Sequence, residues 1–337
     1  MGLRQSWFIR YDLTIQQTFS NPLPFKYYHA FSITMGNSSL NRSKNATDND
    51  EFYTYYSDIK GEIDHYWTQL KGKIVYCNCD SPYSSYYVKY FIRNFNAIGL
   101  KGLVSTCLNN PHGLIFETHS VPANLANASD ATINAWVKTH VRELLGNGGF
   151  QTPECLAVMR RCNVVITNPP FSLFRLWYDC VKMNNKKFLV LCNMNTCLSA
   201  NFLPDLVSNR IRFGWEARNR SYKFWLPDGT IRSLGYICWL TNLRSSVKPF
   251  LPSVNVPISA YPHYDGHPEV IKVSRLTEIP ANYKGLMAVP ITFLFKHNPN
   301  QFKIVGVIGT APSSKYTLFV PYINGKGQYK AVIIKRV

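Results

Sequence analysis

Residues 163–171, Asn-Val-Val-Ile-Thr-Asn-Pro-Pro-Phe, constrain the fold more than any other part of the chain. Four β-branched residues follow one another without polar alternation, which is typical of a strand covered on both faces in a parallel sheet. The two prolines lack the N–H that a ladder needs, so we expect the strand to end at Asn168. Their rings also stiffen the turn. In an open α/β sheet, ligands bind beyond the carboxyl ends of the strands, where this turn lies.

The turn has the chemistry to hold a planar amino group. The Asn168 side-chain oxygen and the Pro169 carbonyl offer two fixed acceptors, which would direct the nitrogen lone pair towards an electrophile. Phe171, after Pro170, offers a flat face on which a base can stack. The structural alternative is a strand-terminating Asn-Pro turn whose phenylalanine fills the core. The strand before the turn and the helical pattern after it favour the functional interpretation.

The balance of charge favours a polyanionic partner. The 337 residues include 37 Lys and Arg against 19 Asp and Glu, a formal net charge of +18. Such an excess indicates either nucleic acid or an anionic membrane surface. The apolar runs are far shorter than the roughly 20 residues that a bilayer-spanning helix needs. We therefore expect nucleic acid as the partner and no membrane association.

The nine cysteines favour reduced thiols over a disulfide framework. Their number is odd, and most of them lie inside apolar runs, as Cys107, Cys192 and Cys238 do. Cys77-Asn78-Cys79 is similar to half of a zinc site, but no second Cys or His pair stands at finger spacing. We therefore expect no metal site, and a reducing, cytoplasmic location.

The rest of the pattern predicts alternating strands and helices, as in an α/β fold. Strands are expected at residues 73–77, 102–107, 163–167 and 187–192, and helices at 50–70, 84–98, 131–145, from Thr152 onward and at 173–183. Gly99 is expected to cap one helix and Thr152, followed by Pro153, to begin another. Further strands are expected at 211–215, 222–226, 235–241, 291–295, 303–308 and 329–335, the first three completing the sheet in antiparallel fashion around a turn at 227–229.

Several segments together resemble a known family. Besides Asn168-Pro169-Pro170-Phe171 they are Asp50-Glu51-Phe52-Tyr53-Thr54, Val75-Tyr76-Cys77-Asn78-Cys79-Asp80, Cys238-Trp239-Leu240-Thr241-Asn242-Leu243, Val289-Pro290-Ile291-Thr292-Phe293-Leu294 and Tyr322-Ile323-Asn324-Gly325-Lys326. Over about residues 37–336 the chain is similar to the EcoRI-type modification methylases. These are adenine-specific DNA methyltransferases that use S-adenosylmethionine.

The resemblance implies an α/β, Rossmann-like methyltransferase fold with a mostly parallel central sheet, antiparallel additions and a C-terminal extension. Residues 35–240 would then bind S-adenosylmethionine and carry catalysis, and 241–337 would supply DNA-recognition loops and strands packed on the core. In residues 242–290, basic and aromatic residues are interleaved, which suits a nucleic-acid surface, although a solvated loop region has the same composition. Residues 1–34 would form a poorly ordered extension before Met35, where the resemblance starts, and would add no catalytic part.

The resemblance also assigns roles to individual residues. The predicted catalytic residues are Asn168, Pro169, Pro170 and Phe171, and the predicted cofactor-binding residues are Phe52, Tyr53, Thr54, Cys77 and Asp80. Asp80 would bind the ammonium group of the cofactor, whereas its structural alternative is a cap at the start of a helix. The chain departs from the family at Gly148-Gly149-Phe150, where members tend to have Gly-Asp-Phe.

We therefore predict a sequence-specific adenine methyltransferase that rotates its target base out of the DNA stack. We expect it to act on double-stranded DNA as a monomer, with a cognate restriction endonuclease as a possible partner. Two alternatives stay open at this point. One is a methyltransferase that acts on RNA or on a protein amide; the other is a DNA-binding relative whose catalysis the change at Gly149 has weakened.

Overall fold

The computed structural model describes residues 52–199, 201–216, 221–226, 229–245, 248–309 and 316–337. The expected extension at 1–34, the start at Met35 and two residues of the turn at 227–229 lie outside these ranges.

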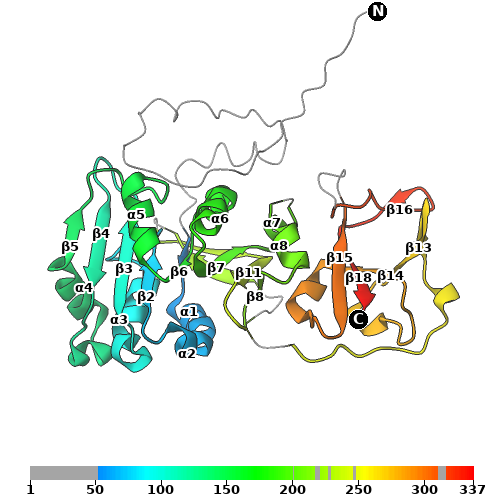
Figure 1. Cartoon of the computed structure of the whole chain (residues 1–337), viewed down its shortest axis with the longest axis horizontal. Coiled ribbons are helices and arrows are strands. Elements are labelled where there is room, and N and C mark those ends of the chain that lie inside the picture. The colour runs from blue at the N-terminus through cyan, green and yellow to red at the C-terminus, as the bar shows by residue number, and fades with distance from the viewer. Residues whose placement is uncertain (1–51, 200, 217–220, 227–228, 246–247, 310–315) are drawn as a thin grey trace, which may run out of the picture. The chain divides into compact units, whose positions relative to one another are not determined.

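Four strands predicted from buried β-branched runs form the centre of an eight-stranded sheet (Figure 1). They are β2 (Ile74–Cys77), β3 (Gly102–Cys107), β6 (Val164–Thr167) and β7 (Lys187–Asn193), and they lie side by side in the order β3-β2-β6-β7. All three of their pairings are parallel. The order of the strands along the chain reverses between β2 and β6, which makes this the switch point where α/β sheets bind ligands.

Antiparallel strands extend the sheet on both sides. β4 (Leu114–Thr118) pairs with β3, and β5 (Val141–Glu143) pairs with β4. On the other side, β11 (Ile237–Thr241) lies between β7 and β8 (Arg212–Phe213), antiparallel to both. The prediction of a mixed α/β protein with parallel and antiparallel strands is confirmed.

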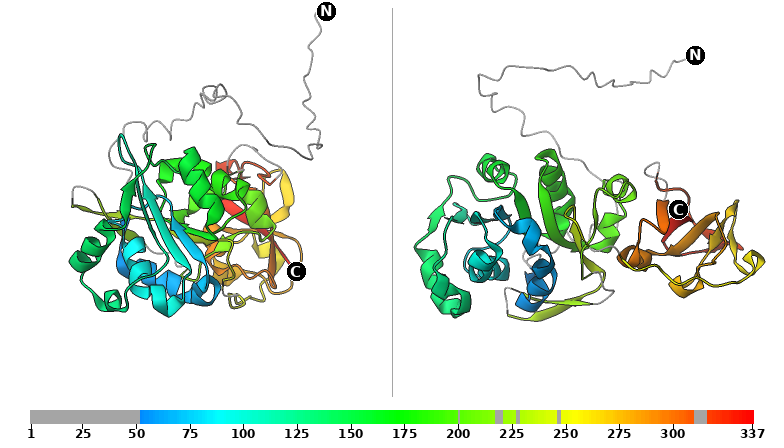
Figure 2. Two further views of the ribbon diagram at one scale, coloured as in Figure 1. Left: turned by 60° about the vertical axis from the view of Figure 1, so that its left-hand side comes forward. Right: turned by 60° about the horizontal axis from the view of Figure 1, so that its bottom comes forward.

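Helices cover both faces of this sheet (Figures 1 and 2). One face packs against α1 (Tyr56–Ile63), α2 (Trp67–Leu70), α3 (Tyr86–Ile98) and α4 (Asp130–Lys138). The other packs against α5 (Pro153–Arg161), α6 (Phe174–Met183), α7 (Met194–Cys197) and α8 (Leu203–Val207). Each face holds one apolar cluster: the first lies on the α1–α4 side and the second on the α5–α8 side. Along β2, Val75 and Cys77 belong to the first cluster and Tyr76 to the second, because successive strand residues point to opposite faces.

The predicted helix ends are confirmed. Gly99 takes a left-handed conformation (φ 70°) after α3, which residues with a Cβ adopt only at a cost. Thr152 begins α5, and its hydroxyl accepts a hydrogen bond from the N–H of Cys155 at 3.3 Å. Short 3₁₀ helices complete the helical part: η1 (Asp64–Tyr66), η2 (Ala123–Asn127), η3 (Phe171–Leu173), η4 (Ile258–Ala260), η5 (Leu276–Glu278) and η6 (Ile291–Lys296).

A small sheet holds the start of the described chain beside the central strands. β9 (Tyr222–Trp225) pairs with both β1 (Tyr53–Thr54) and β10 (Ile231–Leu234), in antiparallel fashion. The side chain of Phe224 is fully buried within the first apolar cluster. The pairing therefore anchors the segment that carries Phe52, Tyr53 and Thr54.

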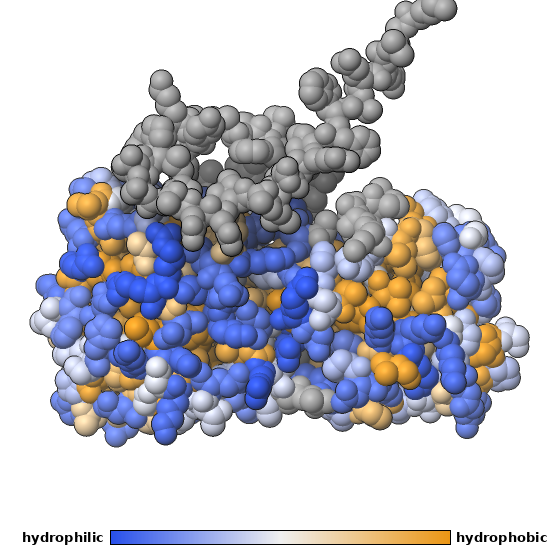
Figure 3. All heavy atoms as spheres, viewed as in Figure 1, coloured by the Kyte–Doolittle hydropathy of each residue, from blue (hydrophilic) through white to orange (hydrophobic). Residues whose placement is uncertain are grey.

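The C-terminal residues build a five-stranded sheet in the order β12-β13-β14-β18-β15. Its strands are β12 (His263–Tyr264), β13 (His267–Lys272), β14 (Leu286–Pro290), β15 (Phe302–Ile308) and β18 (Ala331–Arg336), with a hairpin of β16 (Tyr322–Ile323) and β17 (Lys326–Gly327). Apolar residues gather on the surface over this sheet in one view (Figure 3). The apolar cluster on the α5 and α6 side continues into this sheet through Ile271, Val289 and Phe293.

Four predicted elements were wrong in part. The strand expected at 291–295 is the 3₁₀ helix η6, because β14 ends at Pro290, which has no N–H for the ladder. The helix expected at 131–145 stops at Lys138, and its second half forms the edge strand β5. The helix expected at 50–70 is divided into β1, α1, η1 and α2. The strand expected at 222–226 forms, as β9, but it pairs with β1 and β10 in a separate sheet and does not complete the main one. The strands that were not predicted at all are β4, β10, β12, β13, β14, β16 and β17.

Two further observations concern the helices and the cysteines. Within the described residues, no helix is both long and apolar enough to cross a bilayer. All nine cysteines lie in the described part of the chain, and none of them forms a disulfide there.

Candidate active site

A cavity of about 580 Å³ opens at the carboxyl ends of β2 and β6, at the switch point of the sheet. Three segments far apart in the sequence form most of its wall: Phe52, Tyr53 and Thr54; Asn78 to Tyr87; and Asn147 to Thr152. The predicted turn contributes Asn168, Pro169 and Pro170. The fold thus brings together most of the predicted site residues.

Asn168 is held through its amide nitrogen, and its amide oxygen has no hydrogen-bond partner. Its Nδ2 donates to the carbonyl of Phe52 at 2.6 Å and to the hydroxyl of Thr54 at 3.3 Å. These two contacts fix the orientation of the amide. Its Oδ1 is buried and has no hydrogen-bond partner. A buried acceptor without a donor costs roughly 1–3 kcal/mol, so this atom is suited to a donor brought by a ligand.

Asp80 joins the ends of the two central strands. Its Oδ2 accepts from the hydroxyl of Thr167 on β6 at 2.5 Å, and its Oδ1 accepts from Ser85 at 2.7 Å. The side chain is only 6% exposed, and burial raises its pKa to about 6, against the opposing effect of these hydrogen bonds. The backbone N–H of Asn168 is a third donor to the carboxylate and also lowers its pKa, so one of its four lone pairs remains for a cationic group in the cavity.

Asn78 is a site residue to which the sequence assigned no role. Its Oδ1 accepts from the indole N–H of Trp177 at 2.9 Å, so its Nδ2 points elsewhere. The side chain is 1% exposed, and Nδ2 has no hydrogen-bond partner. Since Asn78 lines the cavity, it offers an unpaired donor two residues before Asp80. No sequence signal indicated this role, because Trp177 lies 99 residues away along the chain.

The loop at 147–152 approaches the cavity through glycine. Gly148 has a φ of 78°, and a Cβ there would lie 2.2 Å from the carbonyl oxygen of Cys107, so no other residue fits. A Cβ at Gly149 would lie 3.3 Å from Asn147 Oδ1, so the Asn147 side chain would have to shift by a few tenths of an ångström, and its next neighbours, at 3.8 and 3.9 Å, are ordinary contacts. The position where the family tends to have an acid therefore lies on the cavity wall and has room for a side chain.

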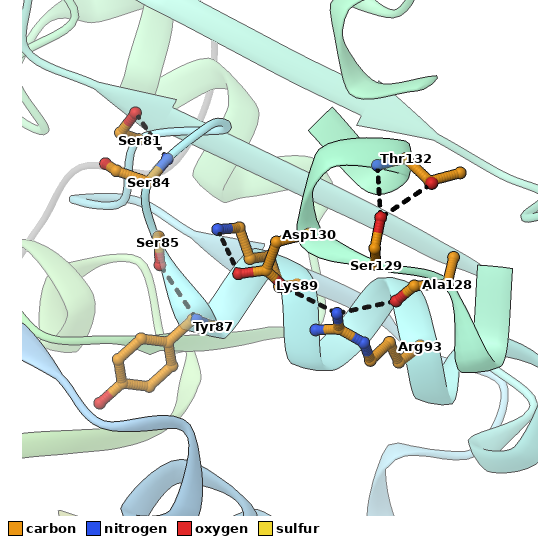
Figure 4. A network of polar contacts seen from close by, with 10 residues as sticks. All are labelled: Ser81, Ser84, Ser85, Tyr87, Lys89, Arg93, Ala128, Ser129, Asp130 and Thr132. Carbon is orange, nitrogen blue, oxygen red and sulfur yellow. Dashed lines mark hydrogen bonds and ion pairs between the residues drawn. The ribbon is translucent and has the colours of Figure 1, made fainter. Parts of the chain in front are cut away.

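A polar network fixes the start of α3 beneath the cavity (Figure 4). The hydroxyl of Ser85 accepts from the N–H of Tyr87 at 3.1 Å and caps the helix. One turn further on, Lys89 and Arg93 both bind the carboxylate of Asp130, at 2.9 and 2.7 Å. The network ties α3 to α4 and keeps the Asp80–Ser85 turn in place.

Two predicted residues do not line the cavity. Phe171 stacks on Phe52, with ring centroids 5.5 Å apart and an interplanar angle of 19°, and meets the edge of Phe224. Phe52, in contrast, does line the cavity. Cys77 is fully buried in the core, so its side-chain position gives no support to a contact with a ligand. The role of each stays a prediction.

The lining of this cavity carries a single carboxylic acid and no basic side chain among the described residues. The acid is Asp80, and no Lys, Arg or His of the described lining accompanies it. An anionic group bound here would therefore meet neutral donors, and a cationic group would meet one carboxylate. These features define an α/β protein with a cavity of ligand size at the carboxyl edge of its sheet.

Comparisons with known proteins agree with this class. The family model described as "Adenine-specific methyltransferase EcoRI" matches residues 39–335. Type II methyltransferase M.EcoRI of Escherichia coli is 31% identical over 333 residues, covering 89% of this chain and 96% of that protein. Type II methyltransferases M.MgeORF184P of Mycoplasma genitalium and M.MpnI of Mycoplasma pneumoniae are 31% and 30% identical, each covering 88% of this chain and 98% of the relative. No solved structure matches.

The chain therefore belongs to the family of EcoRI adenine-specific methyltransferases.

Proposed function

We propose that the protein transfers the methyl group of S-adenosylmethionine to the exocyclic amine of an adenine in double-stranded DNA. Membership of the family makes it an adenine-specific DNA methyltransferase. The observation that carries the residue-level proposal is the unpaired, buried Oδ1 of Asn168, whose Nδ2 is already committed to Phe52 and Thr54.

The residues of the first cavity fit the methyl donor. When bound, S-adenosylmethionine supplies an electrophilic methyl group on a sulfonium sulfur. We assign its ammonium group to Asp80, the only acid of the described lining. Its carboxylate finds no cationic residue there, so we assign it to the unpaired Nδ2 of Asn78 and the start of α3. The Phe52-Tyr53-Thr54 segment forms the opposite wall.

Positioning accounts for the catalysis in this proposal. Asn168 Oδ1 and the carbonyl of Pro169 accept the two protons of the adenine amine and so orient its lone pair. Neither atom can remove a proton at neutral pH, and both oxygens of Asp80 already accept hydrogen bonds. The proton therefore leaves to water after transfer. A fixed near-attack geometry of this kind can supply several kcal/mol of the barrier reduction, about 7–11 in well-oriented model reactions.

The target base has to leave the stack, at a cost of roughly a few kcal/mol. We propose the stacked pair of Phe52 and Phe171 as the platform that receives it. Phe52 faces the cavity and Phe171 supports it from behind, so the platform depends on both rings. Stacking of a base on an aromatic side chain contributes roughly 1–3 kcal/mol.

We assign DNA recognition to residues 241–337, with a second cavity of about 610 Å³ as its centre. The lining includes Lys272, Lys330, Tyr264 and Tyr329, of which Tyr329 is 94% exposed. Tyr236 also lines it and precedes β11, which begins opposite the carboxyl end of β7. Both cavities thus open at the carboxyl edge of the main sheet. Lysines beside aromatic rings suit phosphates and bases.

Residues 35–240 would then carry the methyl donor and catalysis, as the sequence predicted. Action as a monomer and a cognate endonuclease also stay predictions.

The test is to incubate the purified protein with tritiated S-adenosylmethionine and DNA, RNA or protein, and to analyse the modified nucleosides. We expect N6-methyladenine in DNA only. Label in RNA or protein would support the first alternative activity.

A protein that binds DNA and S-adenosylhomocysteine but transfers no label would be the catalytically weakened relative. In that case Gly149→Asp, for which the cavity wall has room, should restore transfer.

A further inference from the structure

Three cysteines that the proposed function does not use meet in the core. Cys192 belongs to β7, Cys197 ends α7 and Cys238 belongs to β11. Cys192 and Cys238 are direct partners on the two antiparallel strands. Each of the three is at most 2% exposed, and none lines the first cavity.

The three sulfur atoms converge on one point. Sγ of Cys192 lies 3.5 Å from Sγ of Cys197 and 3.6 Å from Sγ of Cys238, and all three lie within 4.8 Å of one another. Among the described residues, three His, Cys, Asp or Glu side chains with ligand atoms this close together are found at these three cysteines. The sequence prediction of no metal site considered Cys77 and Cys79, whereas these cysteines are joined only by the fold.

We propose that Cys192, Cys197 and Cys238 form a three-thiolate binding site for a soft, thiophilic metal cation such as Cd²⁺. With Zn–S bonds of about 2.3 Å, three sulfurs around a trigonal ion lie about 4.0 Å apart, and a larger ion such as Cd²⁺ sets them somewhat further apart. The observed spacings need to widen by roughly half an ångström or somewhat more, which small side-chain rotations supply.

The ligand set also selects the kind of ion. Thiolates prefer soft ions such as Cu⁺, Zn²⁺ and their heavier relatives over Mg²⁺ or Ca²⁺. Structural zinc sites have four protein ligands, and no fourth His, Cys, Asp or Glu of the described chain joins this group. We therefore expect an ion that accepts three sulfurs, such as Cd²⁺, to bind more tightly than Zn²⁺.

Binding is balanced by the release of protons: M²⁺ and three thiols give a tris-thiolate complex of charge −1 and three protons. The ion would connect β7 and α7, which are consecutive in the sequence, to β11, which is distant in the sequence. Since it binds the folded arrangement, it should raise the melting temperature.

The test is a titration of the reduced, metal-free protein with Cd²⁺, followed by thiolate-to-metal charge-transfer absorption and native mass spectrometry. We expect one tightly bound ion, and X-ray absorption of the loaded protein should show three sulfur neighbours. Two or fewer sulfurs, or no tight binding, would overturn the proposal. This measurement needs no variant and is independent of methyl transfer.

Variants then locate the site. Cys197→Ser and Cys238→Ser should each weaken Cd²⁺ binding by at least about 100-fold. Mutation of a residue that only hydrogen-bonds to a metal ligand lowers metal affinity about 10- to 100-fold, and loss of the ligand itself should lower it further. Cys162→Ser, which removes another buried cysteine, is the matched control and should bind as the parent does. Equal loss in the control, or no loss in the two ligand variants, would contradict the assignment.

Discussion

The two cavities at the carboxyl edge of the sheet differ in the chemistry of their walls. The first has one acid, no cationic residue among its described lining, and two buried amide atoms without partners, on Asn78 and Asn168. The second has two lysines and several tyrosines, one of them almost fully exposed. Unpaired buried atoms suit a small ligand of defined shape, whereas exposed rings and lysines suit the bases and phosphates of DNA. We therefore expect changes in the first cavity to alter rate or cofactor affinity, and changes in the second to alter DNA affinity.

The largest expected effect is on the rate of transfer. Asn168→Ala should lower the single-turnover rate roughly 100- to 1,000-fold, the range seen when one fixed hydrogen-bonding group is removed from a reacting centre. Binding of S-adenosylhomocysteine and of DNA should stay within a few fold. Thr54→Val, measured at saturating cofactor because Thr54 is itself a predicted cofactor-binding residue, is the control: it removes the 3.3 Å contact to Nδ2 and leaves the 2.6 Å contact to the Phe52 carbonyl, and Oδ1, in place. A near-normal rate in Asn168→Ala would remove this residue from the mechanism.

The next effect is on the cofactor. Asp80→Asn should weaken S-adenosylhomocysteine binding roughly 10- to 150-fold, because hydrogen bonds to charged groups contribute roughly 1.5–3 kcal/mol. Calorimetry at pH 8 measures this. Unchanged affinity would mean that the ammonium group binds elsewhere.

Asp80→Asn, which should weaken cofactor binding, should increase the stability of the folded protein. The pKa of Asp80 is about 6 in the folded protein and 3.8 ordinarily, so between these values the folded state holds more protons than the unfolded state. Ionised Asp80 therefore costs stability, fully above about pH 6 and not at all below pH 3.8. Asp80→Asn should raise the melting temperature at pH 7 to 8, and the gain should shrink as the pH falls towards 4. A gain that is independent of pH would show that ionisation is not the cause.

A smaller effect is expected at Asn78. Asn78→Ala should weaken binding of S-adenosylhomocysteine about 10-fold, and should have little effect on 5′-methylthioadenosine, which lacks the carboxylate. Trp177→Phe leaves the amide of Asn78 without its partner and should show the same selectivity in weaker form. Equal losses for the two ligands would indicate a purely structural role.

The smallest effect should come from the second cavity. Lys330→Gln should lower DNA affinity a few fold and reduce the slope of log affinity against log salt by about 1, while cofactor affinity stays constant. Lys71→Gln makes the same change of charge at an exposed position before the amino end of β2, and should leave the slope unchanged. An equal change of slope in both variants would mean that the attraction of DNA is diffuse and that the second cavity has no special part in it.

The sequence predicted the parts of this site that depend on local patterns. The end of the strand just before Asn168 and the position of Asp80 after β2 followed from apolar runs and proline chemistry. The role of Asn78 could not be predicted, because it depends on Trp177, which only the fold brings near. Strand β4 was missed, since it lies among turn-forming residues and gains its stability from pairing with β3.

The same distinction applies to the aromatic residues. Phe171 was predicted to offer the flat face on which a base stacks, and this stays a prediction; in the structure Phe52 lines the cavity and Phe171 stacks on Phe52. Neighbours in space decide which ring is accessible, and sequence spacing alone does not contain that information.

The central claim is that the unpaired oxygen of Asn168 receives the adenine amine. A crystal structure of the protein with S-adenosylhomocysteine and DNA tests it most directly. We predict that the adenine N6 atom lies about 3 Å from Asn168 Oδ1 and from the carbonyl of Pro169, with Nδ2 still bound to the carbonyl of Phe52. An amine bound by other groups, or an Asn168 amide turned so that Nδ2 faces the base, would contradict the account.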